Sequence, residues 1–329
     1  MTKVMIYGAT GYTGRMAAEH ARQSRLPLIV AGRSAGPLAA LAHRLDAEFR
    51  AFALDDDTVI DAALTDVAVI LNCAGPFPRT ARPLMQAAIR NGVHYLDIAA
   101  ELDSYQLAES LHEAATSAGV MLLPGSGGSV AMLGCLASHA AARVRHPRKV
   151  SIALHVTGGM SRGSAISASE NVTTKTLVRI GDQLSERTSG DTRLFDFGNG
   201  QGAVPCFPVT LPDLITIGHT LAIPDVESFV HVSGNAFPQG ALSALPDGPS
   251  AEERAANRYQ AAVEVVGADG AIARSVLDTV NGYTFTAIAA AEAARRVLAG
   301  DVRSGFQTPA GLFGRGFAET IADTRIVDR

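Results

Sequence analysis

The chain has 329 residues, of which 47% are hydrophobic and 18% are charged, and its formal net charge is −4. This length suits one large domain or two smaller ones, and the composition excludes an intrinsically disordered chain. The mild acidity provides no basic surface for nucleic acid or for an anionic membrane. We therefore expect a protein whose partner is a small molecule, with no nucleic-acid or membrane partner.

The cysteines and the apolar segments indicate the cellular compartment in which the protein is expected. Cys73, Cys135 and Cys206 lie far apart, without metal-ligand spacing, and their odd number makes a disulfide framework improbable. No long apolar segment precedes Gly8, and the apolar window around residues 120–142 is interrupted by proline and glycines. We expect a cytoplasmic protein without a metal site.

In the first 125 residues, short apolar runs alternate with segments of helical periodicity. Helices are predicted to end at Gly92 and Gly119, after residues 80–91 and 102–118. Buried strands alternating with helices are typical of a parallel sheet covered on both faces, which is the doubly wound Rossmann-type α/β fold. Strands are predicted at residues 4–7, 28–31, 49–54, 67–72, 95–98 and 120–123.

The pattern changes near residue 148, which predicts a second, α+β domain with a mixed or antiparallel sheet. Residues 181–213 are rich in Gly, Pro and polar residues, as loops are, and residues 259–276 read as a hairpin. A helix over 283–299 ends at Gly300, and we expect it to return to the first domain. The predicted domains are residues 1–145, 146–280 and a returning C-terminal segment, 281–329.

A glycine-rich turn follows the first predicted strand, in the segment YGATGYTGRM. A strand that enters a helix through such a turn directs backbone N–H groups and the helix dipole at one point, which suits a pyrophosphate. The GxxGxxG spacing differs from GxGxxG, and a turn without a ligand is the alternative. The segment predicts a dinucleotide site that includes Gly8, Thr10, Gly11, Tyr12, Thr13 and Gly14.

The second strand bears on the choice between NAD and NADP. NAD sites place an acidic residue near its end, where this chain has Arg33 and Ser34. A guanidinium can pair with a 2′-phosphate, so we predict NADP, although Arg33 could also be an ordinary surface residue. Asp55 is predicted either to accept a hydrogen bond from adenine or to cap a helix.

The fourth predicted strand ends in the segment NCAGPF, where the nicotinamide half of the cofactor is expected to lie. Small residues there allow close approach to the backbone. The predicted contacts are Cys73, Ala74, Gly75, Pro76 and Phe77.

With these motifs, the chain resembles the saccharopine dehydrogenase-like oxidoreductases. The resemblance rests on GATGYTGR, AGRS, NCAGPF, PLMQAAIRNGVHYLDIAAE, SRGSAISA and the late segments GYTFTAIAAAEAARRVLAG and GFQTPAGLFG. It implies NADP(H), a Rossmann domain completed by the C-terminal segment, and an inserted domain for substrate binding and homodimerisation. Family members reduce C=N bonds of amino-acid-derived imines, or C=C bonds as trans-acting enoyl reductases. The chain departs from many relatives at Ala100 and in residues 125–131.

Candidate catalytic residues follow from the carboxyl ends of the strands, where α/β sheets bind ligands. Tyr95, Asp97 and Glu101 lie at the end of the fifth strand, and the alternative for the two carboxylates is helix capping. Arg162 is expected in a glycine-flanked loop, either as a clamp for a substrate carboxylate or as a solvated arginine. Tyr283 is a candidate proton donor.

Three functions remain open from the sequence. The favoured one is an NADP-dependent oxidoreductase that transfers hydride to a C=N or C=O bond of an amino- or keto-acid-derived substrate. The second is a trans-acting enoyl reductase. The third is an NADP-sensing regulator without catalysis, which would share the glycine turn.

Overall fold

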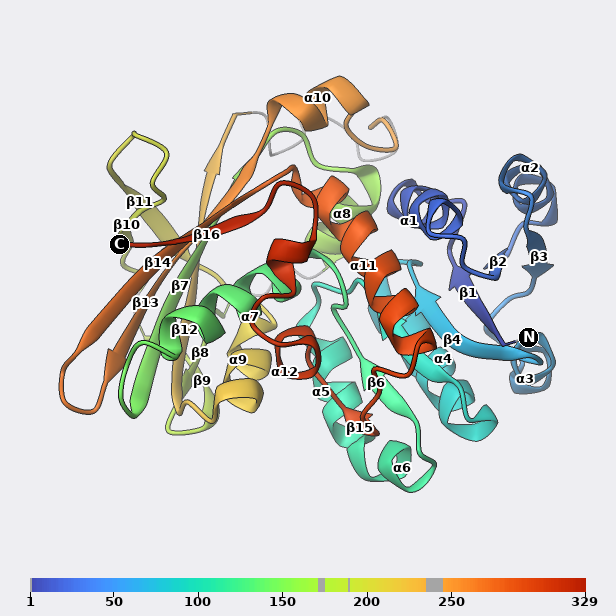
Figure 1. Ribbon diagram of the computed structural model, residues 1–329, viewed down its shortest axis with the longest axis horizontal. Helices are drawn as coiled ribbons and strands as arrows, with labels where there is room; N and C mark the ends of the chain where they lie inside the picture. The colour runs from blue at the N-terminus through green and yellow to red at the C-terminus, as the bar shows by residue number, and fades with distance from the viewer. Residues whose placement is uncertain (1, 171–174, 189, 235–244) are drawn as a thin grey trace. The chain divides into compact units, whose positions relative to one another are not determined.

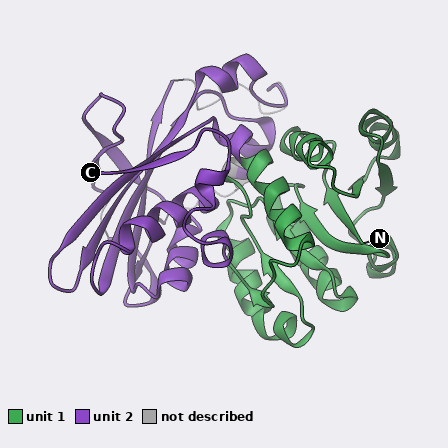
Figure 2. Cartoon of the chain, viewed as in Figure 1, with its two compact units in different colours: residues 1–128, 286–307 green, residues 129–285, 308–329 purple. Residues whose placement is uncertain are grey.

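The chain folds into two compact units, and each unit is formed by two separate stretches of sequence. A computed structural model describes residues 2–170, 175–188, 190–234 and 245–329. The first unit contains residues 1–128 and 286–307, and the second contains residues 129–285 and 308–329 (Figure 2). The C-terminal segment is thus divided between the two units at Gln307 and Thr308.

The first unit is built on a seven-stranded sheet in the order β15-β6-β5-β4-β1-β2-β3, in which all the pairings are parallel (Figure 1). This order contains the 3-2-1-4-5-6 arrangement of a Rossmann fold, so the predicted doubly wound sheet is confirmed. The strands are β1 (Lys3–Tyr7), β2 (Leu28–Gly32), β3 (Glu48–Ala51), β4 (Val67–Asn72), β5 (His94–Asp97), β6 (Met121–Leu123) and β15 (Gly305–Phe306).

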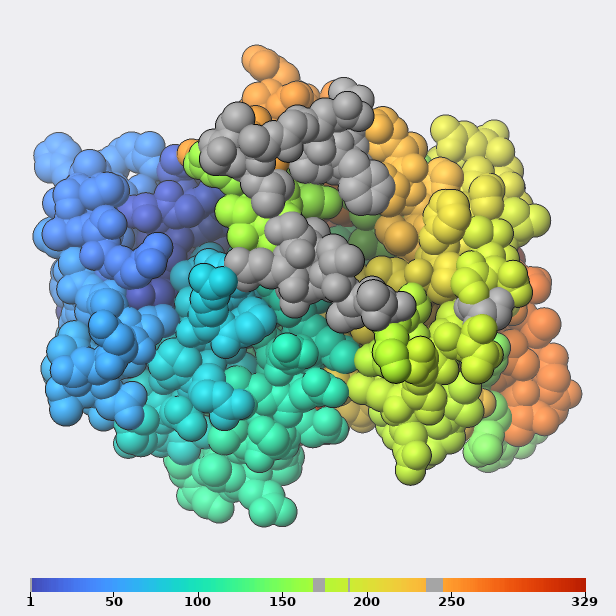
Figure 3. Space-filling model, turned by 180° about the vertical axis from the view of Figure 1, so that it is seen from behind, coloured from blue at the N-terminus to red at the C-terminus, as the bar shows by residue number. Residues whose placement is uncertain are grey.

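Helices cover both faces of this sheet, which explains why its central strands are nearly continuous apolar runs. Helix α5 packs against both α4 and α6, and the residues of these helices form the cyan and turquoise surface in Figure 3. The helices of this unit are α1 (Tyr12–Gln23), α2 (Ala35–Leu45), α3 (Asp57–Ala63), α4 (Phe77–Asn91), α5 (Leu102–Ser110), α6 (His112–Ser117) and part of α11 (Gly282–Leu298).

Several predicted boundaries need correction. Helix α4 begins at Phe77, three residues before the predicted start at residue 80. The proline after Phe77 is tolerated because it occupies a first-turn position that needs no N–H donor. The predicted helix over 102–118 is two helices that meet at Leu111, where the Ser110 hydroxyl bonds the Leu107 carbonyl and competes with the backbone. The predicted helix stops are confirmed, since Gly92 and Gly119 have φ values of 67° and 68°.

The second unit is built on a nine-stranded mixed sheet, as predicted, with β10-β11-β12-β7-β13-β14-β16 as its main path. The hairpin β13–β14 closes around residues 268–271, as expected. Residues 181–213 are not a continuous loop, because β10 and β11 form an antiparallel pair there. The strands are β7 (Pro147–Thr157), β8 (Leu177–Ile180), β9 (Gln183–Glu186), β10 (Arg193–Asp196), β11 (Ala203–Pro208), β12 (Asp225–Ser233), β13 (Tyr259–Gly267), β14 (Ile272–Thr279) and β16 (Arg325–Asp328).

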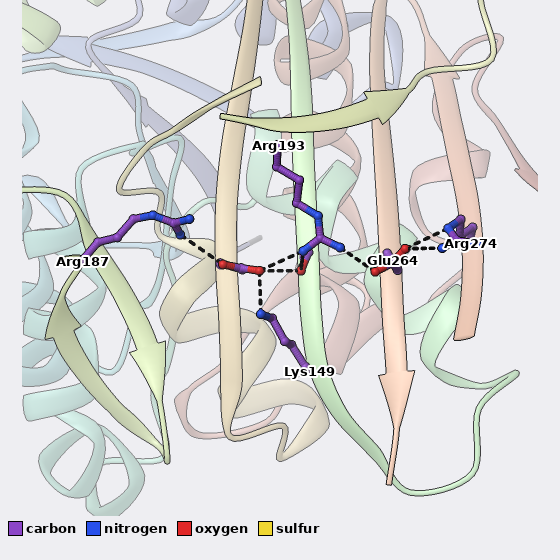
Figure 4. A network of polar contacts seen from close by, with 7 residues as sticks. Lys149, Arg187, Arg193, Glu264 and Arg274 are labelled. Carbon is purple, nitrogen blue, oxygen red and sulfur yellow. Dashed lines mark hydrogen bonds and ion pairs between the residues drawn. The ribbon is translucent and has the colours of Figure 1, made fainter. Parts of the chain in front are cut away.

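An apolar cluster and a charged network lie next to each other on the second sheet. One face carries a small buried cluster that includes Phe195, Phe197 and Phe229. Next to it, charged side chains form a network around Glu227 and Glu264 (Figure 4). The helices of this unit are α7 (Gly128–Ala141), α8 (Arg162–Glu170), α9 (Asp213–Leu221), α10 (Ala251–Ala256), α12 (Pro309–Phe313) and the 3₁₀ turn η2 (Ala318–Thr320), together with the start of α11.

Candidate functional site

The glycine turn between β1 and α1 leaves no room for side chains. Gly8 has a φ of +80°, and a Cβ there would lie 2.7 Å from the backbone nitrogen of Ala74. A Cβ on Gly14 would collide with the carbonyl oxygen of Gly8. Because a Cβ at Gly8 or Gly14 would come this close to backbone atoms, any other residue at either position would distort the turn.

The start of α1 fits a diphosphate group. Gly11 is the N-cap residue, its cap makes no side-chain hydrogen bond, and the first turn contains no acidic residue. Thr10 is exposed beside it, and Tyr12 and Thr13 are partly exposed. The helix dipole and the first-turn N–H groups therefore favour an anion here, and no carboxylate of the first turn would repel it.

The predicted adenosine end gathers around the start of α2. Arg33 is exposed, and Ser34 is the N-cap of α2 without a side-chain cap bond or an acidic residue in the first turn. Burial raises the pKa of Tyr7, while the charge of Arg33 lowers it and that of Asp55 raises it. Arg33 and Asp55 are thus each within electrostatic reach of Tyr7, although β3 ends at Ala51 and Asp55 lies in the following loop.

A buried hydrogen-bond network joins the ends of β4 and β5. The Asn72 side-chain nitrogen donates to the Tyr95 hydroxyl at 3.2 Å and to the Thr80 hydroxyl at 3.0 Å. The Tyr95 hydroxyl donates to Oδ2 of Asp97 at 3.0 Å. Asn72, Tyr95 and Asp97 are each 0% exposed, so the predicted catalytic residues Tyr95 and Asp97 face one another inside the domain.

Asp97 also holds the loops that follow β5 and β6. Its Oδ1 accepts from the backbone N–H groups of Ala99 at 3.0 Å and Gly125 at 2.7 Å. The Ser126 hydroxyl donates to its backbone carbonyl at 2.8 Å. Burial raises the pKa of the Asp97 carboxyl to about 6, against the lowering effect of these amides and of Tyr95.

The segment after β4, predicted to contact the nicotinamide half, is clamped by the same network. The N–H of Ala74 donates to Oδ1 of Asn72 at 3.0 Å, and its carbonyl accepts from the Thr80 hydroxyl at 2.6 Å. Burial and the charge of Asp97 raise the pKa of the Cys73 thiol. Gly75 is exposed and is joined to Pro76 by a cis peptide bond, after which Phe77 starts α4.

Glu101 is the N-cap residue of α5, but its side chain makes no cap hydrogen bond. It is 8% exposed, its Oε2 accepts from the Ala100 N–H at 2.9 Å, and its Oε1 has no hydrogen-bond partner among the described residues. Its charge also acts to raise the pKa of Asp97. The capping alternative is thus not seen for Glu101, and one buried carboxylate oxygen remains available for another group.

The two candidates from the second unit engage other side chains of that unit. Arg162 begins α8 rather than lying in a loop, because the Ser161 hydroxyl accepts from the Ser164 N–H and caps the helix. The Arg162 guanidinium pairs with Asp247. The Tyr283 hydroxyl accepts from the Ser161 N–H at 2.7 Å and donates to the Ser164 hydroxyl at 3.0 Å. The clamp and proton-donor roles of Arg162 and Tyr283 stay predictions.

Sequence reasoning missed the roles of Asn72 and Thr80. Asn72 ends a buried strand, and a buried asparagine at the carboxyl edge of a sheet is the signal that could have identified it. Thr80 lies in the first turn of α4 and has no sequence pattern that separates it from a helix-surface threonine. Within residues 2–170, 175–188, 190–234 and 245–329, no group of three or more His, Cys, Asp or Glu side chains could hold a metal ion.

In the same described residues, no helix is both long and apolar enough to cross a membrane.

Comparisons with known proteins agree with this geometry. The family model of the saccharopine dehydrogenase NADP binding domain matches residues 4–123. A human saccharopine dehydrogenase-like oxidoreductase is 30% identical in an alignment of 144 residues that covers 38% of this chain and 34% of that protein. A trans-acting enoyl reductase of Mycobacterium leprae (strain TN) is 30% identical in an alignment of 132 residues that covers 37% of this chain and 32% of that protein. The chain thus spans about a third of the length of the curated relatives that it matches.

Solved structures share the fold at low sequence identity. Apo saccharopine dehydrogenase (L-Glu forming) from Saccharomyces cerevisiae has a TM-score of 0.66 and 12% identity, covering 99% of this chain and 100% of that chain. Homospermidine synthase from Legionella pneumophila has a TM-score of 0.64 and 9% identity, covering 100% of this chain and 91% of that chain. Residues 4–123 thus match the saccharopine dehydrogenase NADP binding domain, and the chain shares its fold with these solved structures.

Proposed function

We propose that the protein is an NADP-dependent oxidoreductase that transfers hydride to a C=N or C=O bond of an amino- or keto-acid-derived substrate. The observation that carries this proposal is the buried carboxylate of Glu101, whose Oε1 has no partner among the described residues. It lies after β5, at the edge of the sheet where α/β folds bind their ligands.

The charge of this edge favours a C=N substrate over a neutral one. Glu101 and Asp97 influence each other electrostatically, and both are buried. When bound, NADPH supplies the hydride. An iminium carbon accepts hydride while its nitrogen loses positive charge, and the Glu101 carboxylate would stabilise the cationic form and fix its orientation. A carbonyl would need an added proton, for which Glu101 in its protonated form is the proposed source.

A matched pair of variants tests the role of Glu101. Glu101→Gln should lower kcat/KM by about a hundredfold, the typical contribution of a positioned acid or base, in a screen of 2-oxo acids mixed with amines. The dissociation constant of NADPH should not change. Glu109→Gln, an exposed glutamate of the same helix, should behave as the wild type. Equal activity in all three proteins would remove Glu101 from the proposal.

We propose that Arg33 and Ser34 select NADP by binding the 2′-phosphate. Arg33 is exposed and has no ion pair among the residues that the structure describes. In fluorescence titrations, wild type should bind NADPH more tightly than NADH, and Arg33→Ala should reduce that preference at least about tenfold. Arg25→Ala, an exposed arginine that precedes β2 at the opposite edge of the sheet, is the control. An unchanged preference in Arg33→Ala would exclude this role.

A trans-acting enoyl reductase is the second candidate, and the observation that favours it is the mycobacterial relative of that name. An α,β-unsaturated acyl group is neutral, so the Glu101 charge should not help its reduction. Turnover of enoyl thioesters, with Glu101→Gln as active as wild type, would favour this candidate. Tight NADPH binding without turnover in either screen would favour a sensor.

We also propose that the protein acts as a homodimer, which rests on the family resemblance alone. Light scattering should then give about twice the chain mass of 34.2 kDa. A mass of one chain at micromolar concentration would contradict it.

A further inference from the structure

The network around Asn72 has only one possible direction of donation. Oδ1 of Asn72 accepts from the Ala74 N–H, so its amide nitrogen must face Thr80 and Tyr95. The Tyr95 hydroxyl oxygen accepts a hydrogen bond from that amide nitrogen. The single proton of the hydroxyl group is therefore donated to Asp97. Two amides already donate to Oδ1 of Asp97, so a proton on the carboxyl group would have to sit on Oδ2, the atom that receives the Tyr95 proton.

This directed chain ends on backbone groups of three loops. At one end it holds both the N–H and the carbonyl of Ala74, which follows β4. At the other end it holds the N–H groups of Ala99 and Gly125, which follow β5 and β6. Since Gly8 packs against Ala74 without room for a Cβ, the network also supports the glycine turn.

We propose that Asn72, Tyr95 and Asp97 are positioning residues, which fix the loop after β4 for the nicotinamide half of NADP, and that Tyr95 and Asp97 do not donate a proton to substrate. This inference rests on the proposed cofactor site. It replaces the catalytic role predicted for Tyr95 and Asp97, because the Tyr95 proton is committed to Asp97 and both side chains are 0% exposed. Burial and the Asp97 charge also raise the pKa of Tyr95 well above its ordinary value.

Protonation of Asp97 should loosen the loops. The titratable groups that act on Asp97 are Tyr95, Cys73 and Glu101, and burial brings its pKa to about 6. A protonated carboxyl would donate to Tyr95, whose oxygen already accepts from Asn72, so the Tyr95 proton would lose its acceptor. Binding of the nicotinamide half should therefore weaken as the pH falls from 7 to 5.

Two ligands separate this effect from general damage: NADPH, and 2′-phospho-ADP-ribose, which lacks the nicotinamide ring. Tyr95→Phe keeps the volume but removes one hydrogen-bond partner from Asn72 and one from Asp97, while their other bonds remain. We expect its NADPH dissociation constant to rise about tenfold, and that of 2′-phospho-ADP-ribose to stay within about twofold. Tyr105→Phe is the control, because its fully buried hydroxyl bonds the Ala99 carbonyl in the loop after β5 and not the loop after β4 that the proposal concerns.

The pH dependence provides a readout that a merely structural role would not move. In wild type, the dissociation constant of NADPH divided by that of 2′-phospho-ADP-ribose should rise as the pH is lowered from 7 to 5. Both ligands carry the 2′-phosphate, which also titrates, so its effect cancels in this ratio. Asp97→Asn keeps an acceptor for the two amides but cannot accept the Tyr95 proton. Its ratio should already be high at pH 7 and should not change with pH. The double variant Tyr95→Phe/Asp97→Asn should lose little more than either single variant.

The outcomes distinguish the two proposals. If wild type binds neither ligand, the cofactor site itself is wrong. If wild type binds both but Tyr95→Phe matches Tyr105→Phe, or loses both ligands equally, the positioning role is overturned. Should Tyr95→Phe fail to fold, Thr80→Val, which removes the bond to the Ala74 carbonyl from a partly exposed position, takes its place with the same expected selectivity.

Discussion

Two glycines of the first unit, Gly14 and Gly36, have different reasons to be glycine. A Cβ on Gly14 would meet the Gly8 carbonyl, whereas nothing lies within 4 Å of a Cβ on Gly36 in α2. Gly14→Ala should lower the free energy of unfolding by about 1–3 kcal/mol through overpacking and should abolish NADPH binding. Gly36→Ala should raise it by about 0.5–1 kcal/mol, as expected of a helical site with free space. Chemical denaturation measures the free energy of unfolding, and fluorescence titration measures NADPH binding. Equal changes in the free energy of unfolding for Gly14→Ala and Gly36→Ala would refute the packing argument.

Asp213 is a buried carboxylate outside the proposed site. It is 0% exposed, and neither side-chain oxygen has a hydrogen-bond partner among the described residues. Burial raises its pKa to about 7, which its own backbone N–H offsets only in part. An unfolded aspartate titrates near 3.9, so the folded state binds the proton more tightly and loses stability as pH rises from about 4 to 7.

Replacing Asp213 should therefore stabilise the protein only at higher pH. Asp213→Asn should raise the free energy of unfolding by roughly 2–4 kcal/mol at pH 8 and change it little at pH 4. Urea denaturation at the two pH values measures the difference. A gain of equal size at both would mean that charge is not the cause.

Single residues also mark where sequence reasoning succeeds. The stops at Gly92 and Gly119 could be predicted because a left-handed C-terminal residue has a strong local preference for glycine. The helical start at Arg162 was missed although its signal is local: the glycine that follows it suggested a loop, whereas the Ser161 hydroxyl caps the helix by accepting from the Ser164 N–H. Asn72 was missed for a different reason, since the Tyr95 and Thr80 hydroxyls that it bonds come from other elements.

At the scale of elements, Glu227 on β12 links three cations. Lys149, Arg187 and Arg193 lie within 2.8, 3.1 and 2.9 Å of its carboxylate (Figure 4). Burial alone would raise the pKa of Glu227, but hydrogen bonds from Lys149, Ser151 and Arg187 outweigh it and lower the pKa to about 2. This stabilisation is fully present above about pH 4.5 and is lost as the pH falls towards 2.

Glu227→Gln should therefore destabilise the protein by about 1–3 kcal/mol at pH 7 and by much less at pH 3. Glu186, which pairs with Lys175 on the surface, is the matched control, and Glu186→Gln should change stability by less than about 0.5 kcal/mol. Thermal and urea unfolding at both pH values provide the measurement. If both glutamine variants behaved alike, the network would contribute no more than a surface ion pair.

The elements show a graded agreement with prediction. The buried strands β1, β2 and β4 were predicted within a residue, because apolar runs bounded by glycine and proline are strong signals. The pair β10–β11 was not predicted, because its strands are short and its sequence is rich in glycine and proline. Its stability comes from Phe195 and Cys206, which pack against the larger sheet and leave no periodic pattern of their own.

At the scale of the whole molecule, the first unit is interrupted between residues 128 and 286, yet the two ends of the interruption lie together. A Cβ on Gly128 would lie 3.2 Å from the Thr286 hydroxyl. Residues 1–128 joined to 286–307 by a short glycine-rich linker should therefore unfold cooperatively and bind NADPH. Residues 1–128 alone lack β15 and the helix that precedes it, and they should do neither. Circular dichroism and NADPH titration compare the two, and NADPH binding by the shorter fragment would contradict the expectation.

The parallel sheet of the first unit could be predicted from the sequence. Strands that alternate with helices can be connected by right-handed crossovers in only a few strand orders. The arrangement of the site could be predicted only as far as the strand ends. Which of Asp97 and Glu101 keeps a carboxylate oxygen available depends on loop geometry, and the sequence pattern treats the two alike.

The pairing of β15 with β6 has a consequence for biosynthesis. Gly305 and Phe306 leave the ribosome only after the whole inserted stretch 129–285 has been translated. Until then β6 is an edge strand with unpaired backbone groups, which are a template for pairing with other nascent chains. The nascent chain therefore carries an incomplete nucleotide-binding sheet during most of its synthesis, and this interval is when a chaperone would be most useful to it.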